Sequence, residues 1–168
     1  LLPWMSRETQ DDTNHALLYT IPTFQNPTGI VMPTPRREKL LKYCNEMHIP
    51  IIEDDVFRDL WLDSPPPPPI KSLDGHGNVV YISSLSKCFA PGLRLGWLVG
   101  PEAVVQRLAD VKMQMDYGVS VLTQQVAEEL LRTGLYEKGV QNIRSQLTER
   151  RDFMIRLLER YFSEFAEW

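Results

Sequence analysis

Several side chains with reactive or charged groups stand close together in one short stretch of this sequence. The segment SSLSKCFAPGLR places Ser84, Ser86 and Lys87 directly after an apolar run, and Arg94 follows the lysine by seven residues. A guanidinium with short hydroxyl donors suits a phosphate monoester. A lysine amine that lies beside a cation and is partly removed from water favours its neutral form, which reacts with aldehydes to form a Schiff base. A single lysine at a strand end can also simply reach for water, so the neighbouring motifs decide between these interpretations.

Two further polar residues complete the candidate set. Asn26 lies in the loop TFQNPTG, and Asp54 lies where the apolar run IPII turns acidic in EDD. A carboxylate that stays ionised in a site keeps a heteroaromatic ring nitrogen protonated, which makes the ring an electron sink. A phosphate, an aldehyde and a basic ring nitrogen together describe pyridoxal 5'-phosphate, so these residues predict a site for that cofactor.

Apolar segments predict four strands that position these residues, at 17–21, 49–54, 78–84 and 93–99. The first three are separated by connections long enough for right-handed parallel crossovers. Only about nine residues separate the third strand from the fourth, whereas parallel neighbours need a crossover of a dozen or more, so the fourth strand is expected to be antiparallel. A helix is predicted over about residues 35–48, with Thr34 as its N-cap and Pro35 at its first position.

This order of elements brings the candidate side chains to one edge of the predicted sheet. In an open α/β sheet, ligands bind beyond the carboxyl ends of the parallel strands. Asn26 follows the first strand, Asp54 ends the second, and Lys87 with its two serines follows the third. The antiparallel fourth strand starts at the same edge and brings Arg94 with it. We therefore expect all six side chains to surround a single crevice.

The sequence from Pro101 onward is predicted to be helical. Apolar residues at helical spacing mark one helix around 104–115, a second over 121–132 and a long third after Tyr136. The third carries apolar residues near heptad spacing, which we interpret as an amphipathic helix packed on the domain, with a free coiled coil as the alternative. Five consecutive prolines at 65–69 predict a stiff, extended surface loop.

Composition limits the classes of function. The chain has 168 residues, of which 43% are hydrophobic and 24% charged, as is typical of a folded domain. A net charge of -4 without a Lys/Arg block argues against nucleic-acid binding by this segment itself. Cys44 and Cys88 fit no zinc spacing, which favours reduced thiols in a cytoplasmic protein, and the isolated histidines predict no metal site. No run of 18 apolar residues is present, and residues 1–15 lack the plan of a signal peptide. Because the chain begins without methionine, we expect a fragment of a longer protein.

Three motifs in order, NPTG, IIEDD and SLSK with an arginine seven residues after the lysine, make the chain similar to the fold-type I aminotransferases of class I/II. The resemblance implies a three-layer α/β/α fold whose sheet is mostly parallel with one antiparallel strand. It implies that Lys87 is the catalytic lysine, which binds the cofactor and moves a proton at the substrate α-carbon. It further implies that Asp54 pairs with the pyridine nitrogen of the cofactor and that Asn26 donates to its phenolic oxygen. The phosphate would be held by Ser84, Ser86 and Arg94.

More closely, the segments YTIPTFQNPTGIVM, IPIIEDDVFRDLW, APGLRLGWLVGPE and ADVKMQMDYG resemble the aminotransferase-like half of MocR-type transcriptional regulators of the GntR superfamily. In that family a separate winged-helix domain, which this chain does not contain, binds DNA, and the pyridoxal-phosphate domain senses an effector. The alternative is a free-standing amino-acid aminotransferase of the aminoadipate kind, which transfers an amino group to a 2-oxo acid.

The resemblance also implies domain boundaries and an assembly. Residues 1–118 would be the C-terminal part of the large, cofactor-binding domain, and residues 119–168 the helical connection and the start of the small domain. A homodimer is implied, because the sites of the family lie at a dimer interface.

The chain departs from the family pattern after the aspartate. Family members commonly carry a tyrosine where this chain has Val56 or Phe57, so efficient transamination is not implied. The family also places part of its site outside this window, including an arginine for the substrate carboxylate, so the fragment alone is not expected to catalyse. A remote alternative is a phospho-receiver domain, in which an acidic pair at a strand end binds Mg²⁺.

Overall fold

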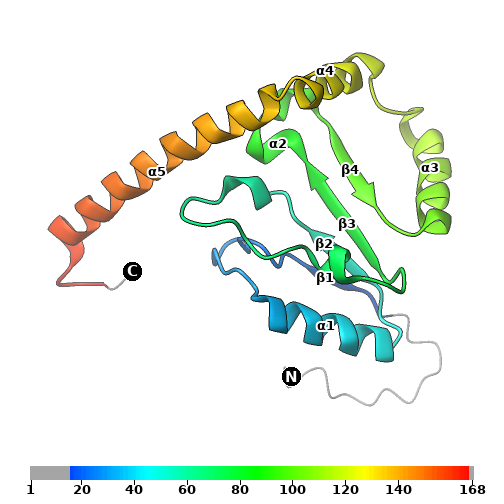
Figure 1. The fold of residues 1–168 in the computed structure, drawn as a ribbon, viewed down its shortest axis with the longest axis horizontal. Coiled ribbons are helices and arrows are strands. Elements are labelled where there is room, and N and C mark those ends of the chain that lie inside the picture. Colours follow the sequence, from blue (N-terminus) through cyan, green and yellow to red (C-terminus); the bar gives the residue numbers. More distant parts are fainter. Residues whose placement is uncertain (1–15, 167–168) are drawn as a thin grey trace.

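The structure is a computed structural model that describes residues 16–166, and the expectations for residues 1–15 lie outside this range. Four strands and five helices form the described part, with three short 3-10 turns between them (Figure 1). The strands are β1 (Leu18–Thr20), β2 (Ile51–Asp54), β3 (Val79–Ser84) and β4 (Gly96–Val99). The helices are α1 (Thr34–Glu46), α2 (Leu85–Cys88), α3 (Glu102–Asp116), α4 (Val121–Arg132) and α5 (Leu135–Phe162).

The sheet has the order β1-β2-β3-β4, with parallel pairing from β1 to β3 and an antiparallel β4. The four predicted strands and their directions are confirmed, but β4 begins at Gly96, three residues later than predicted. A 3-10 turn over Pro91–Leu93 precedes it, so Arg94 lies before the strand. The short connection before β4 contains the single helical turn α2, which the sequence analysis did not predict. A single helical turn is too short for the crossover that a parallel neighbour needs, so β4 is antiparallel to β3 even though α2 lies between them.

Helix α1 begins one residue earlier than predicted. Thr34 is its first helical residue, and Pro33 is the N-cap, in extended conformation and without a side-chain capping bond. The prediction that Thr34 caps this helix is therefore wrong. Pro35 still lies in the first turn, where the missing N–H of proline costs nothing.

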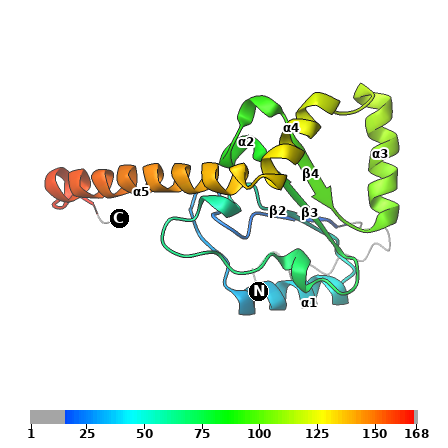
Figure 2. The ribbon, with the colours of Figure 1, turned by 45° about the horizontal axis from the view of Figure 1, so that its top comes forward.

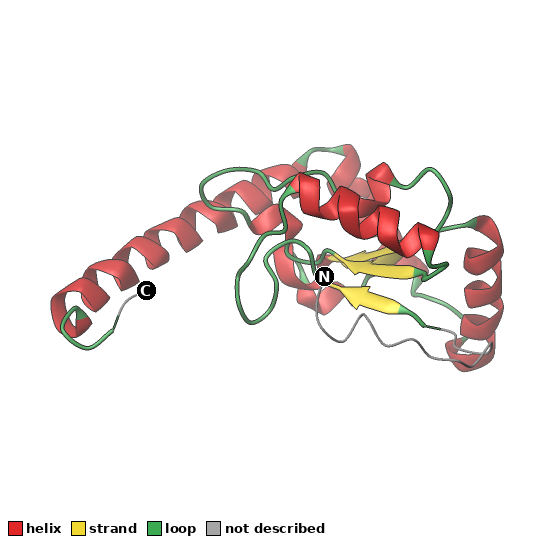
Figure 3. Cartoon of the chain, turned by 90° about the horizontal axis from the view of Figure 1, so that it is seen from below, coloured by secondary structure: helices red, strands yellow, loops and turns green. Residues whose placement is uncertain are grey.

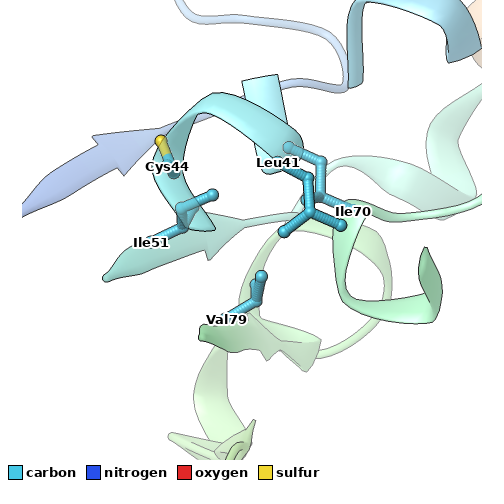
Figure 4. Packing of buried hydrophobic residues seen from close by; sticks show 5 residues of the cluster. All are labelled: Leu41, Cys44, Ile51, Ile70 and Val79. Atoms are coloured by element: carbon cyan, nitrogen blue, oxygen red, sulfur yellow. The ribbon is translucent and has the colours of Figure 1, made fainter. Parts of the chain in front are cut away.

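The hydrophobic core lies between α1 and the sheet (Figure 4). Leu41 and Cys44 of α1 pack against Ile51 of β2, Val79 of β3 and Ile70 of the turn after the proline run. Alternate residues of β2 face this core, because successive side chains of a strand point to opposite faces. Asp54 therefore belongs to the face of the sheet that does not pack on α1.

A wholly buried ion pair ties the proline run to this core. Arg37 of α1 lies 3.6 Å from Glu53 of β2, and both side chains are fully buried. The guanidinium of Arg37 donates to the carbonyl oxygens of Pro22, Met32 and Pro68. The carboxylate of Glu53 accepts from the backbone amides of Ile70 and Lys71, each at 2.8 Å. The extended loop predicted from the prolines is thus held at the carbonyl oxygen of Pro68.

Helices α3 and α4 lie at the β4 side of the sheet, and the second half of α5 projects away from it (Figures 1, 2 and 3). The predicted packing of the long helix on the domain is confirmed only for its first half. Val140 is buried, whereas Met154 is 56% and Tyr161 58% exposed. Within residues 16–166, no helix has the length and apolar character needed to cross a membrane.

Candidate functional site

Strand register places the predicted site residues at one end of the sheet. Asp54, the last residue of β2, pairs with Ile82, and Ser84, the last residue of β3, pairs with Gly96. Arg94 precedes β4 by two residues, and Asn26 lies in the loop after β1. A methyl group on Gly96 would stand 3.0 Å from the carbonyl oxygen of Ser83, so glycine permits this close approach of β4. The carboxyl ends of the parallel strands therefore carry all the expected groups, as the topology argument required.

The two carboxylate oxygens of Asp54 differ in their surroundings. Oδ2 accepts a hydrogen bond of 2.5 Å from the hydroxyl of Tyr19 on β1. Oδ1 is buried and has no hydrogen-bond partner within the described part of the chain. A buried acceptor without a partner costs free energy, so this atom is suited to a donor from a bound molecule.

Ser84 is the N-cap of α2, and Lys87 lies within the single turn of this helix. The hydroxyl oxygen of Ser84 caps the helix by accepting a bond of 3.1 Å from the Ser86 amide, and its hydrogen remains free to donate. The Lys87 side chain is exposed, and no hydrogen bond or ion pair to residues 16–166 engages its amine. The partial removal of Lys87 from water that the sequence analysis expected is not found. The reason is that no element of the described chain covers α2 on that side.

The guanidinium of Arg94 is also exposed and nearly unengaged. Its one hydrogen bond within residues 16–166 is a long one of 3.4 Å to the carbonyl of Pro91. Arg94 has a left-handed backbone conformation with φ 51°, which is uncommon for a residue with a β-carbon. A cation held at the sheet edge with free donors can take up an anionic group.

The loop after β1 is organised by Gln25, whose role the sequence analysis missed. Its amide oxygen accepts from the backbone and hydroxyl of Thr28, and its amide nitrogen donates to the carbonyl of Asn26. The Asn26–Pro27 peptide bond is cis. Asn26 is exposed, and no hydrogen bond within residues 16–166 engages its side-chain amide.

A cavity of about 640 Å³ borders the site at this loop. Asn26 and Phe57 both line it, together with Phe24, Leu60, part of the proline run and Arg151. Of the six predicted site residues, only Asn26 reaches this cavity. Phe57, which stands where family members carry tyrosine, contributes an apolar ring to its wall.

A polar contact between α2 and α5 fixes the position of the turn that carries Lys87. The hydroxyl of Tyr136 on α5 donates to Oδ2 of Asp59 at 2.5 Å and lies 3.2 Å from Sγ of Cys88. Burial and then the hydrogen bond to Asp59 raise the pKa of Tyr136 above its ordinary value, and burial raises that of the Cys88 thiol. Both groups are therefore neutral at physiological pH, and they join α2 to α5 as hydrogen-bonding groups.

The sequence analysis missed Tyr19 and Tyr136 as well as Gln25. A signal for Tyr19 was present, because a tyrosine within a short apolar strand carries a hydroxyl that needs a partner when the strand is packed. The partner of Tyr136 had no local signal, since Asp59 lies 77 residues away in the chain. Among the described residues, no group of three His, Cys, Asp or Glu side chains is arranged to hold a metal ion.

Comparison with known proteins identifies a matching family and similar sequences. A family model described as "Aminotransferase class I and II" matches residues 8–167. The chain is 49% identical over 168 residues to the uncharacterized HTH-type transcriptional regulator YdfD of Bacillus subtilis, covering 100% of this chain and 35% of that protein. It is 44% identical over 151 residues to the HTH-type transcriptional regulator NorG of Staphylococcus aureus, covering 90% of this chain and 34% of that protein. The chain thus spans about a third of the length of these curated relatives.

Two solved aminotransferases have the same fold. The kynurenine aminotransferase of Pyrococcus horikoshii, solved with PMP, superposes with a TM-score of 0.85 at 37% identity, over 91% of this chain and 38% of that one. The α-aminoadipate aminotransferase LysN of Thermus thermophilus, complexed with N-(5'-phosphopyridoxyl)-L-leucine, gives a TM-score of 0.81 at 32% identity, over 88% and 39%.

Proposed function

Because the chain belongs to the aminotransferase class I and II family, we propose that it binds pyridoxal 5'-phosphate at the sheet edge described above, as the cofactor-binding part of a transcriptional regulator. The fold-type I architecture expected from the resemblance is confirmed by the solved neighbours, and the phospho-receiver alternative is wrong.

One observation carries the cofactor proposal: the buried, unpartnered Oδ1 of Asp54 lies at the carboxyl edge of the sheet. This oxygen would accept a hydrogen bond from the protonated ring nitrogen of the cofactor. Arg94 and the hydroxyls of Ser84 and Ser86 would hold the phosphate, and the amide of Asn26 would donate to the phenolic oxygen. These groups have free donors or acceptors in the described chain, so the donor set fits the cofactor.

Bound pyridoxal phosphate supplies an electron sink for the electron pair released at the substrate α-carbon. The residues of this chain supply the rest. The free amine of Lys87 would bind the cofactor covalently and then carry the proton to and from the α-carbon. The anionic Asp54 would keep the ring nitrogen protonated, and the phosphate contacts would fix the orientation of the ring.

Borohydride reduction tests this proposal. The intact protein is incubated with pyridoxal phosphate, reduced, digested and analysed by mass spectrometry. We expect a stable adduct on Lys87, its loss in Lys87→Ala, and its retention in Lys39→Ala, which removes an exposed lysine of α1. A label spread over surface lysines, or one that persists in Lys87→Ala, contradicts the proposal.

A second arm tests the phosphate contact. Because hydrogen bonds to charged groups contribute about 1.5–3 kcal/mol each, Arg94→Ala is expected to weaken binding of pyridoxal phosphate about tenfold or more. Binding of pyridoxal, which lacks the phosphate, is expected to change little. Equal losses for both compounds would show that Arg94 acts through the fold instead of the phosphate.

The regulatory part of the proposal is supported by the relatives. Curated relatives at 43–50% identity are HTH-type regulators, whereas the solved kynurenine aminotransferase of Pyrococcus horikoshii is 37% identical. We infer that this segment senses an amino acid or a related 2-oxo acid and that DNA is bound by a separate winged-helix domain of the same protein. Such a protein works in the cytoplasm, which agrees with the two free, buried cysteines.

A free-standing aminotransferase of the aminoadipate kind is the second candidate, favoured by the superposition on LysN. A mobility-shift assay and a transamination assay on the intact protein separate the two. DNA binding that responds to an amino acid supports the regulator, whereas steady transamination without DNA binding supports the enzyme.

We further propose that residues up to 118 belong to the large domain and that residues 119–168 lead into the small domain. Gly118, with a φ of 125°, lies between α3 and α4 and supports a change of direction there. We also propose a homodimer, supported by exposed apolar side chains near this point: Met115 is 79% and Tyr117 87% exposed. Light scattering on the intact protein tests the dimer, and a monomeric mass contradicts it.

A further inference from the structure

Tyr19 and Asp54 lie on neighbouring parallel strands and on the same face of the sheet. Tyr19 pairs with Ile52, and Asp54 lies two residues further along β2. Residues related in this diagonal way are within reach of an aromatic side chain. The phenol of Tyr19 spans the distance and donates to Oδ2 of Asp54 at 2.5 Å.

This hydrogen bond makes the two oxygens of the carboxylate unequal. A carboxyl group turns about its last side-chain bond with a broad, two-fold preference, so its plane needs an external contact to fix it. The contact from Tyr19 holds Oδ2 and leaves the buried Oδ1 without a partner among the described residues. The oxygen that remains free is the buried one, where a hydrogen bond from a ligand is strongest.

Tyr19 remains a donor over the whole physiological pH range. The hydrogen bond to Asp54, followed by burial, raises the pKa of Tyr19 to about 12. The side chain is nevertheless 55% exposed, so its apolar packing alone does not account for its position. The hydrogen bond to the Asp54 carboxylate fixes the hydroxyl end of the ring.

Resting on the proposed function, we propose that Tyr19 is a positioning residue for the cofactor: its hydroxyl orients the Asp54 carboxylate so that Oδ1 meets the ring nitrogen. Tyr19 itself touches no reacting atom. It acts through Asp54, and its effect is confined to ligands that carry a ring nitrogen.

The test compares two ligands on the intact protein. One is pyridoxal phosphate, and the other is its 1-deaza analogue, in which carbon replaces the ring nitrogen. Dissociation constants are measured by ligand fluorescence for the wild type, Tyr19→Phe and the control Tyr161→Phe, which alters a tyrosine of α5 with a similar exposure of 58%. We expect Tyr19→Phe to weaken binding of pyridoxal phosphate about tenfold, the loss of one hydrogen bond to a charged group, and to leave the deaza analogue within about twofold.

The same measurement in an Asp54→Ala background closes the cycle. There the effect of Tyr19→Phe is expected to vanish, because the group that it orients is gone. An equal loss for both ligands, or no loss for either, overturns the positioning role while the cofactor proposal stands. A wild-type protein that binds neither ligand overturns the cofactor proposal, and the positioning role with it.

Discussion

Gly139 of α5 lies directly against the aromatic ring of Phe89, which follows α2. A methyl group on its α-carbon would stand 2.2 Å from Cε2 of that ring. The ring also lies 5.5 Å from the ring of Tyr136, measured between centroids. The long helix and the turn that carries Lys87 therefore meet at a point where only glycine fits.

Gly139→Ala is expected to lower the free energy of unfolding of the intact protein by up to about 2 kcal/mol. The overpacking cost of about 1–3 kcal/mol exceeds the gain of about 1 kcal/mol from helix propensity. Urea denaturation measures the change. In a Phe89→Ala background the added methyl has room, so there the same substitution is expected to stabilise. A loss that is unchanged in that background contradicts the clash.

Arg37→Met is expected to destabilise the protein by about 3–5 kcal/mol, because it leaves the carboxylate of Glu53 buried without its cation. Burial already raises the pKa of Glu53, although the hydrogen bonds from the backbone amides of Lys71 and Ile70 lower it in part. The loss should therefore shrink as the pH falls and Glu53 takes up a proton. Thermal unfolding at several pH values measures this. Arg36→Met, at the exposed neighbouring position, is the control and is expected to change stability by less than about 0.5 kcal/mol.

Asp74→Asn is expected to reduce stability at neutral pH by about 1–2 kcal/mol and to remove a pH dependence in the acid range. Burial opposes ionisation of Asp74, but hydrogen bonds from Asn78, Lys71, Val79 and His76 outweigh it and hold its pKa at about 2, below the ordinary 3.8. A depressed folded-state pKa contributes stability above the unfolded value, which is lost as the pH falls toward 2.

The wild type should therefore approach the stability of Asp74→Asn as the pH falls from about 4 to about 2. Glu38→Gln, which changes an exposed carboxylate of α1, controls for the loss of one charge. A constant difference between wild type and variant across this range contradicts the assignment.

Phe57→Tyr restores the hydroxyl that the family commonly carries, in the wall of the cavity that Asn26 lines. A hydroxyl that donates to the phenolic oxygen of the cofactor would stabilise the deprotonated form of the bond between the cofactor and Lys87. The pKa of that bond would therefore fall. The pH transition in the visible absorbance of the loaded protein is expected to move to lower pH. Phe153→Tyr, on the exposed part of α5, should leave the transition in place. A shift to higher pH, or none, means that residue 57 does not face the cofactor.

The sequence by itself determined the order and direction of the strands. Local patterns were sufficient: apolar runs for the strands, and connection lengths that allow a parallel crossover or exclude it. From this order alone, Asp54, Ser84 and Arg94 were expected at one edge, and the register of β2, β3 and β4 places them there. The motifs also predicted the family. Their roles toward the cofactor remain predictions.

Only the tertiary structure decided which side chains meet between elements. Arg37 reads as one more exposed charge of an amphipathic helix, yet it is fully buried against Glu53. The contacts of Tyr19 with Asp54 and of Gly139 with Phe89 depend on strand register and on the separation of two helices, neither of which a local pattern encodes. The exposure of Lys87 likewise follows from which elements cover α2. Burial and pairing are properties of the packed chain, because a side chain loses water only where another element occupies its place.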